Sequence, residues 1–169
     1  AEDFSRLKAV FKKDGTVTPA NSSSISDGAA AMVLMRASQA AKLGLSPIAR
    51  IVGHTTHAGV PALFPSAPVG AMQKLLAKTG WTAANVDLWE INEAFAVVTM
   101  AAIHDMQLPV EKVNIHGGAC ALGHPIGATG ARIIVTLLHA LKARNLKRGI
   151  ASLCIGGGEA TAMALELSD

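Results

Sequence analysis

The sequence predicts a layered α/β domain. Apolar runs of strand length alternate along the chain with segments whose apolar residues recur at helical spacing. Half of the 169 residues are apolar and 16% are charged, so a sizeable core is available and disorder is not expected. Aromatic residues are scarce, with no Tyr, four Phe and two Trp. The core must therefore be built from Ala, Val, Ile, Leu and Met.

Four elements are expected in the first half of the chain. Residues 28–35, with the sequence GAAAMVLM, predict a buried strand. A short helix follows and ends near Gly44, because glycine is a common C-terminal helix cap. Residues 48–56 predict a second strand. Residues 66–79 predict a helix that Gly80 ends, and one face of this helix carries Val69, Met72, Leu75 and Leu76.

The second half continues the alternation. Residues 87–91, DLWEI, predict a short strand that leads directly into a helix over residues 93–106. This helix is apolar nearly all round, so it is expected to be buried on every side. Residues 113–115 are a further strand candidate, and residues 131–143 predict an amphipathic helix. Two β runs, GIASLCIG and ATAMALEL, close the chain as a hairpin around residues 156–158.

Composition excludes several classes of function. The formal charge is +3, and no basic run contains interleaved aromatic residues, so nucleic-acid binding is not expected. No apolar run reaches the roughly 20 residues of a membrane span. Cys120 and Cys154 form no CxxC pair, which favours free thiols in a reducing, cytoplasmic compartment. The chain begins at Ala1 rather than Met, which indicates either processing or part of a longer polypeptide.

The first candidate for chemistry is the run Asn92-Glu93-Ala94-Phe95 at the junction of a predicted strand and helix. Two interpretations are open. Asn92 can cap the helix, because its side-chain oxygen can accept from free backbone N–H groups. Alternatively, the polar side chains face a cleft beside the apolar helix.

The second candidate is the glycine-rich loop over residues 117–130, GGACALGHPIGATG. His124 stands between Gly and Pro, which fix the backbone, so it is a candidate base or oxyanion donor. The alternative is a structural histidine bonded to a carbonyl. His116 and Cys120 precede it at four-residue spacing, but Pro125 and the glycines argue against one helix with three metal ligands. No metal site is expected.

The third candidate is Cys154, which is followed by Ile155 and three glycines at a predicted strand end. Its thiol can exchange protons, and the glycine N–H groups can hold an oxyanion. The alternative is a buried cysteine ahead of a flexible hairpin. The fourth candidate is the small polar run over residues 15–23, continued by residues 26–28. It is either a loop that binds an extended ligand or an ordinary polar loop.

Together these clusters closely resemble the thiolase family over residues 5–167. The signatures are GTVT-x-x-N-x-S with DGAAA, then NEAFA, then GGA-x-A-x-GHP-x-GA-x-G, then C-x-GGG. The resemblance implies a layered αβαβα stack of two similar halves. This chain would form mainly the C-terminal half, a mixed sheet with helices on both faces. Residues 46–169 would be the C-terminal thiolase domain. Residues 1–45 would be the end of the loop region and the last strand and helix of the N-terminal half.

The resemblance also implies roles for individual residues. His124 would activate a nucleophilic cysteine and help to form a first oxyanion hole, and Asn92 would hold a water that completes it. Cys154 would be the acid/base at the α-carbon of the second acyl-CoA. The backbone N–H of Gly156 would belong to a second oxyanion hole.

The substrate expected from the resemblance is a coenzyme A thioester, with no resident cofactor. Ser23 would contact the pantetheine arm, Phe11 would form part of its wall, and Ala94 and Phe95 would complete this binding surface. The reaction would be the condensation of two acetyl-CoA to acetoacetyl-CoA, or its reversal by thiolysis. GHPIGATG and CIGGG are typical of the bacterial short-chain enzymes.

One family feature is expected upstream of these residues. The nucleophilic cysteine of thiolases belongs to the N-terminal half, and Cys120 is interpreted as structural. The expected partners are therefore an N-terminal thiolase half and, at full length, further copies in a homodimer or tetramer. The alternative is a short, non-catalytic paralogue that binds coenzyme A esters or pairs with another thiolase chain.

Overall fold

The computed structural model describes residues 4–168, and its four strands form one mixed sheet in the order β1-β4-β3-β2. The central strands are β4 (Glu159–Leu167) and β3 (Arg148–Ile155), which form the predicted antiparallel hairpin. β1 (Ala49–Ala58) pairs antiparallel with β4, and β2 (Leu88–Ile91) pairs parallel with β3. The parallel pair brings the C-terminal ends of β2 and β3 to the same edge of the sheet.

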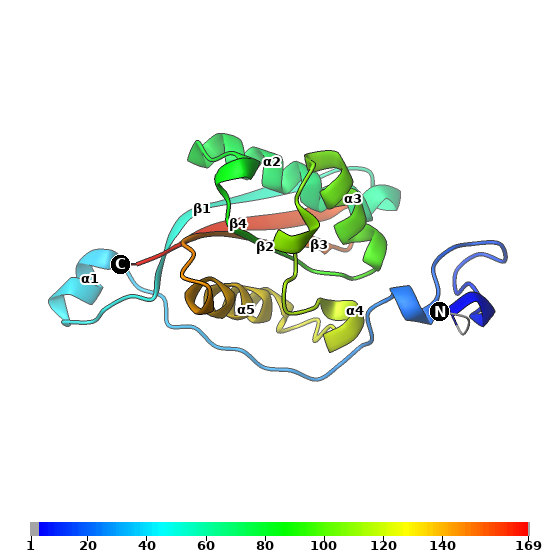
Figure 1. Cartoon of the computed structure of the whole chain (residues 1–169), viewed down its shortest axis with the longest axis horizontal. Coiled ribbons are helices and arrows are strands. Elements are labelled where there is room, and N and C mark those ends of the chain that lie inside the picture. The colour runs from blue at the N-terminus through cyan, green and yellow to red at the C-terminus, as the bar shows by residue number, and fades with distance from the viewer. Residues whose placement is uncertain (1–3, 169) are drawn as a thin grey trace.

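Helices cover both faces of this sheet, as the sequence predicts (Figure 1). α2 (Ala67–Thr79) and α3 (Ala96–Met106) lie on one face, and α5 (Thr129–Ala143) lies on the other. The core under α2 and α3 includes the fully buried side chains of Met72, Leu75, Trp89, Val98 and Ile150. The core under α5 includes Ile133, Leu137 and Leu141.

Glycines end two of the elements where the sequence indicates. Gly80 follows α2 in the left-handed region at φ 70°, where it closes the last helical turn. Gly158 lies at φ 90° in the hairpin turn, and a side chain there would meet the carbonyl of Gly59. The remaining short elements are α1 (Ala37–Lys42), α4 (Ala119–Leu122), η1 (Phe4–Arg6), η2 (Pro19–Asn21), η3 (Pro61–Ser66), η4 (Ala83–Asn85) and η5 (Val110–Lys112).

The strand expected over residues 28–35 is not formed. This segment runs as an open arc on the α5 side of the molecule (Figure 1). Val33 and Leu34 are 87% and 70% exposed. No strand of the described chain lies beside it, so its backbone has no ladder to join. Residues 113–115 are also not a strand, because Val113 forms only an isolated bridge with Trp89.

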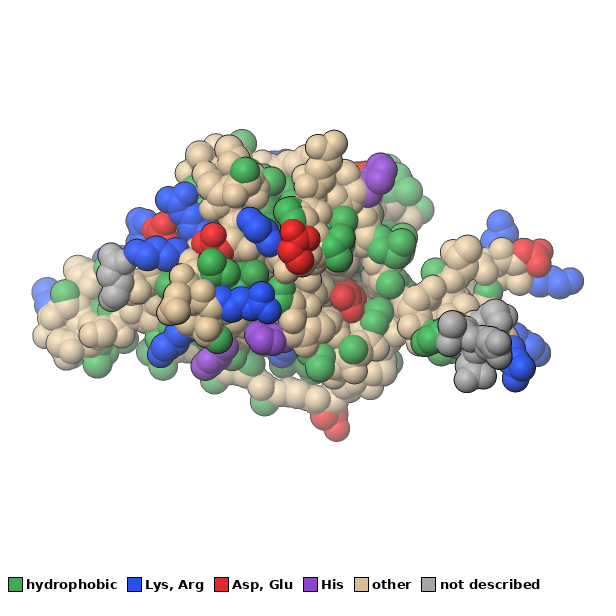
Figure 2. Space-filling view, in the orientation of Figure 1, with side chains coloured by type: hydrophobic (Ala, Val, Ile, Leu, Met, Phe, Trp, Pro, Cys, Tyr) green, Lys and Arg blue, Asp and Glu red, His purple; other side chains and the backbone are tan. Residues whose placement is uncertain are grey.

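The helix expected to be buried on every side is buried on one side only. α3 begins at Ala96 rather than at residue 93 and presents Val98 and Ala102 to the core. Its opposite face leaves Val97 and Met100 46% and 64% exposed, and Figure 2 shows hydrophobic side chains at the surface there. Within residues 4–168 no further layer covers this face.

Candidate active site

The candidate site lies at the edge where β2 and β3 end. Asn92 follows β2 directly, and its backbone N–H donates to the carbonyl of Ser152 in β3 at 2.9 Å. The Asn114 side chain holds the last residue of β2 from the other side, bonding both the N–H and the carbonyl of Ile91 at 2.8 Å. The carboxyl ends of strands are where α/β proteins commonly bind ligands.

The side chain of Asn92 contacts the ring of His124. Its side-chain Nδ2 lies 3.5 Å from His124 Nε2, and the residue is 1% exposed. Asn92 does not cap α3, because the N-cap position is Phe95 and no side chain caps it. Asn92 Oδ1 is buried and has no hydrogen-bond partner among the described residues. The structure therefore favours the cleft interpretation of Asn92 over the helix cap.

His124 is fixed at three of its atoms. Its backbone N–H donates to the carbonyl of Ser24 at 2.9 Å, and its Nδ1 lies 2.6 Å from the Thr129 hydroxyl. Its Nε2 faces Asn92. Burial, with a smaller contribution from the Arg132 charge, lowers the pKa of His124 below its usual value. His124 is therefore neutral at neutral pH, the form that can accept a proton.

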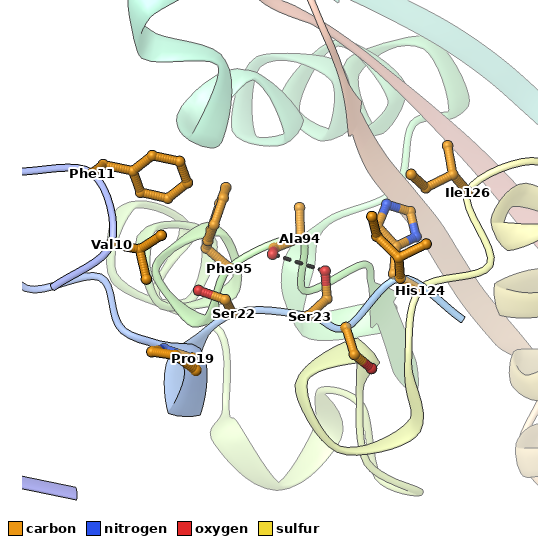
Figure 3. A pocket seen from close by; sticks show the side chains of 11 residues that line it. Val10, Phe11, Pro19, Ser22, Ser23, Ala94, Phe95, His124 and Ile126 are labelled. Carbon is orange, nitrogen blue, oxygen red and sulfur yellow. Dashed lines mark hydrogen bonds between the residues drawn. The ribbon is translucent and has the colours of Figure 1, made fainter. Parts of the chain in front are cut away.

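The His124 ring forms part of the wall of a cavity of about 310 Å³. Five of the residues predicted from the sequence line it together, namely Phe11, Ser23, Ala94, Phe95 and His124 (Figure 3). The remaining wall consists of Val10, Pro19, Ser22, Ser24, Ile25 and Ile126. The cavity therefore combines a mainly apolar wall with one titratable side chain.

Ser23 and Phe11 of the N-terminal segment contact the two residues that precede α3. The N–H and the hydroxyl of Ser23 both donate to the carbonyl of Ala94, at 3.1 and 3.0 Å. The Phe11 ring meets the Phe95 ring edge-on, with centroids 5.7 Å apart. Phe11 is nevertheless 73% exposed, although it lines the cavity.

Cys154 and Gly156 do not line this cavity. Cys154 lies near the end of β3, two residues beyond Ser152, and its half-buried side chain packs against the core under α2 and α3. Burial raises the pKa of its thiol. Gly156 lies in the exposed hairpin turn, with open space where a Cβ would stand. Cys154 and Gly156 lie at or beyond the same end of β3 as Ser152, which bonds the backbone of Asn92.

Cys120 bonds Glu93 and does not line the cavity. The Cys120 N–H donates to a Glu93 carboxylate oxygen at 3.1 Å, and its thiol lies 3.7 Å from the Glu93 carbonyl. Burial first, and then the Glu93 charge, raise the pKa of the Cys120 thiol. A raised pKa leaves little thiolate, which is the nucleophilic form.

Sequence reasoning missed two residues that hold His124 and one buried acid on β2. Thr129 bonds His124, and Ser24 anchors the His124 backbone. Thr129 occupies a variable position of the glycine-rich signature, and Ser24 lies one residue beyond the signature that ends at Ser23. Glu90, on β2, is 2% exposed and lies 3.8 Å from Arg132. Burial, opposed in part by Arg132, raises the pKa of Glu90 from 4.5 to about 7. A lone carboxylate within an apolar strand gives no pattern that would signal this.

Residues 4–168 contain neither a metal-binding cluster nor a membrane-spanning helix. No group of three or more His, Cys, Asp or Glu side chains is placed to hold a metal ion. His54 and His57 project from β1 in different directions, toward the Thr161 hydroxyl and toward Gly70 of α2 respectively. No helix in this range is long and apolar enough to cross a membrane.

Comparison with known proteins gives consistent matches. The thiolase C-terminal domain family matches residues 45–167, and the thiolase N-terminal domain family matches residues 1–38. An acetyl-CoA acetyltransferase of Allochromatium vinosum is 49% identical over 166 residues, which are 98% of this chain and 42% of that protein.

Solved structures agree. The acetyl-CoA acetyltransferase of Bacillus anthracis superimposes with a TM-score of 0.96 at 47% identity. Human mitochondrial 3-ketoacyl-CoA thiolase in complex with CoA superimposes with 0.89 at 36% identity. Each match covers 99% of this chain and 42% of the other, so the chain spans less than half the length of these relatives. From the extent of these family matches, this chain belongs to the thiolase family.

Proposed function

We propose that this chain supplies the acid/base and oxyanion half of a thiolase that acts on coenzyme A thioesters. The reaction is the reversible condensation of two acetyl-CoA to acetoacetyl-CoA and CoA, or the thiolysis of a 3-ketoacyl-CoA. The observation that carries the proposal is the contact of buried Asn92 with His124 at the wall of an apolar cavity. Similarity to acetyl-CoA acetyltransferases supports the short-chain substrate.

In the first half of the reaction, a cysteine thiol of an N-terminal thiolase segment attacks the thioester carbonyl. His124 Nε2 takes the thiol proton and returns it to the departing CoA sulfur. The lowered pKa of His124 supports this role, because a neutral imidazole is the base. Asn92 holds a water beside Nε2, and the two together stabilise the oxyanion.

In the second half, the Cys154 thiolate removes a proton from the α-carbon of a second acetyl-CoA. The resulting enolate carbon attacks the acyl-enzyme carbonyl, and acetoacetyl-CoA forms as the nucleophilic cysteine leaves as a thiolate. Transfer of the proton from Cys154 to this thiolate restores both cysteines to their starting forms. The N–H of Gly156 stabilises the enolate oxygen. In thiolysis Cys154 returns the proton, and the raised pKa of its thiol suits it to that donor role.

The cavity binds the pantetheine arm of the thioester. Phe11 and Phe95 offer apolar surface. The bond of Ser23 to Ala94 fixes the segment whose serines, residues 22–24, are the polar part of the cavity wall. The thioester is a substrate, and the proposal includes no resident cofactor and no metal.

The proposed boundaries and partners follow the same logic. Residues 46–169 form the C-terminal thiolase domain, and residues 1–45 belong to the N-terminal half. Val97 and Met100 of α3 then pack against that half in the layered αβαβα stack, which accounts for their exposure here. The assembled enzyme is proposed to be a homodimer or tetramer in the cytoplasm, in keeping with its free thiols.

Thiolysis of acetoacetyl-CoA by CoA tests the proposal. The chain is assayed alone, and together with a separately expressed N-terminal thiolase half that carries the nucleophile. Turnover only in the mixture is the expected result. Turnover by the chain alone that Cys120→Ala abolishes would assign the nucleophile to Cys120. Tight coenzyme A ester binding without turnover in either sample would instead identify a non-catalytic paralogue.

A further inference from the structure

We infer that Thr129 is a positioning residue that fixes the tautomer of His124, with the proton on Nδ1 and a free lone pair on Nε2. The catalytic consequence of this inference rests on the proposed function. The tautomer itself rests only on the contacts of His124 within this chain.

The direction of the Thr129 hydrogen bonds sets the proton on Nδ1. Thr129 Oγ1 donates to the carbonyl of Pro125 at 3.0 Å and lies 2.6 Å from His124 Nδ1. A hydroxyl has one proton, and a carbonyl can only accept. The proton is therefore engaged by Pro125, and Oγ1 accepts from an Nδ1–H group. Thr129 is 1% exposed, so water does not compete for this position.

The contact at His124 Nε2 supports the same tautomer. Asn92 Nδ2, which can only donate, lies 3.5 Å from His124 Nε2. An acceptor on one side of the ring and a donor on the other both require Nδ1–H and unprotonated Nε2. The competing arrangement turns the Asn92 amide so that Oδ1 accepts from Nε2–H. It also forces Thr129 to give up its bond to Pro125, so the two arrangements are mutually exclusive.

The fold places Thr129 firmly enough for this task. Thr129 is the first residue of α5, five positions after His124, and α5 is anchored in the core by Ile133 and Leu137. The backbone of His124 is held separately by Ser24. The ring is therefore fixed by Thr129, while its backbone is fixed by another segment. A base with its lone pair on Nε2 is the form that can take a thiol proton.

The tautomer can be measured directly in this chain. The chain is labelled with ¹⁵N-histidine, and NMR correlates the ring nitrogens with the carbon-bound ring protons, which distinguishes protonated from unprotonated nitrogen. The signals that disappear in His124→Gln are those of His124. We expect Nδ1–H in the wild-type chain and in Thr129→Ser. Thr129→Val keeps the shape but loses the acceptor, so the Nε2–H form should become populated. Nε2–H in the wild-type chain, or an unchanged tautomer in Thr129→Val, would overturn the inference.

Kinetics separate this inference from the proposed function. Together with the N-terminal half, Thr129→Val should lower kcat/KM by about tenfold or more, which is part of the 10²–10⁴-fold that a general base contributes. Thr129→Ser should restore most of it. Full activity in a Thr129→Val sample that shows the switched tautomer would refute the positioning role. No turnover by wild type, with Nδ1–H observed, would refute only the proposed function. If Thr129→Val does not fold, the wild-type spectrum alone still decides the tautomer.

Discussion

The side-chain amide of Asn92 meets the imidazole of His124 at 3.5 Å, across a sequence separation of 32 residues. One residue follows a buried strand and the other lies in a glycine-rich loop, so only the fold brings them together. Both are held by backbone bonds to other segments, at Ser152 and Ser24 respectively. The pair is therefore preorganised, which is what stabilisation of a developing oxyanion requires.

Asn92→Ala should impair turnover more than folding. In the mixture with an N-terminal half, we expect kcat to fall by about 10²–10³, the usual effect of losing one oxyanion donor. Asn92 Oδ1 has no partner among the described residues, so the substitution breaks few protein contacts. Thermal unfolding of the variant serves as the control. An activity loss below about threefold would argue against the role of Asn92.

Gly118→Ala should destabilise the chain, because a Cβ at residue 118 would collide with the Glu93 carboxylate. That carboxylate also bonds Asn114 and the Cys120 N–H, so moving it loosens the glycine-rich loop. A loss of about 1–3 kcal/mol in the free energy of unfolding is expected for such overpacking. Gly127→Ala is the matched control, since nothing lies within 4 Å of its Cβ position. Equal urea midpoints for the two variants would contradict this account of Gly118.

Glu90 should make the chain less stable as pH rises. Burial raises its folded-state pKa to about 7 from 4.5, so the folded state holds a proton that the unfolded state releases. This contribution is fully present below pH 4.5 and is lost as pH rises to about 7. The two pKa values correspond to about 3 kcal/mol. Arg132 and Glu93 are the charges that act on Glu90.

Glu90→Gln tests this directly, because glutamine resembles the protonated acid. Urea unfolding at pH 5 and pH 8 should show a variant that is more stable than wild type at pH 8 and close to it at pH 5. If the wild-type chain became more stable from pH 5 to pH 8 while Glu90→Gln did not, the shifted pKa of Glu90 would be contradicted. The variant reports the contribution of the other carboxylates.

Phe11→Ala should weaken binding of a coenzyme A ester. The Phe11 ring lines the cavity and contacts Phe95, yet most of its surface is exposed. Losing one aromatic wall should raise Kd by roughly tenfold, or about 1.4 kcal/mol. Phe4→Ala is the control, because Phe4 is also exposed but does not line the cavity. Calorimetric titration with acetyl-CoA compares the two, and equal affinities would remove Phe11 from the binding surface.

Local patterns predicted most of the secondary structure. Helix α2, strands β1 and β2, and the β3–β4 hairpin all follow from periodicity and glycine positions. The prediction of a strand over residues 28–35 was wrong. An apolar run predicts burial, but a strand also needs a neighbouring strand to pair with, and the described chain offers none there. The same reason explains α3, whose apolar outer face is uncovered within this chain.

The candidate site was predicted by motif rather than by geometry. Five of the residues that the motifs select line one cavity. What spacing alone could not give is which partner holds each side chain. The Thr129 bond to His124 and the Glu93 bond to Cys120 depend on how the glycine-rich loop folds back against β2. Buried Glu90 was missed because one acid in an apolar strand has no periodic signature.

In the proposed reaction, His124 acts in the first half and Cys154 in the second. Release of CoA from acetyl-CoA by the chain mixed with an N-terminal half, followed in the first turnover, tests this assignment most directly. We predict a burst of CoA with wild type, Cys120→Ala and Cys154→Ala, and no burst with His124→Ala. Condensation to acetoacetyl-CoA should be lost in Cys154→Ala. A full burst with His124→Ala, or its loss in Cys154→Ala, would contradict this division of roles.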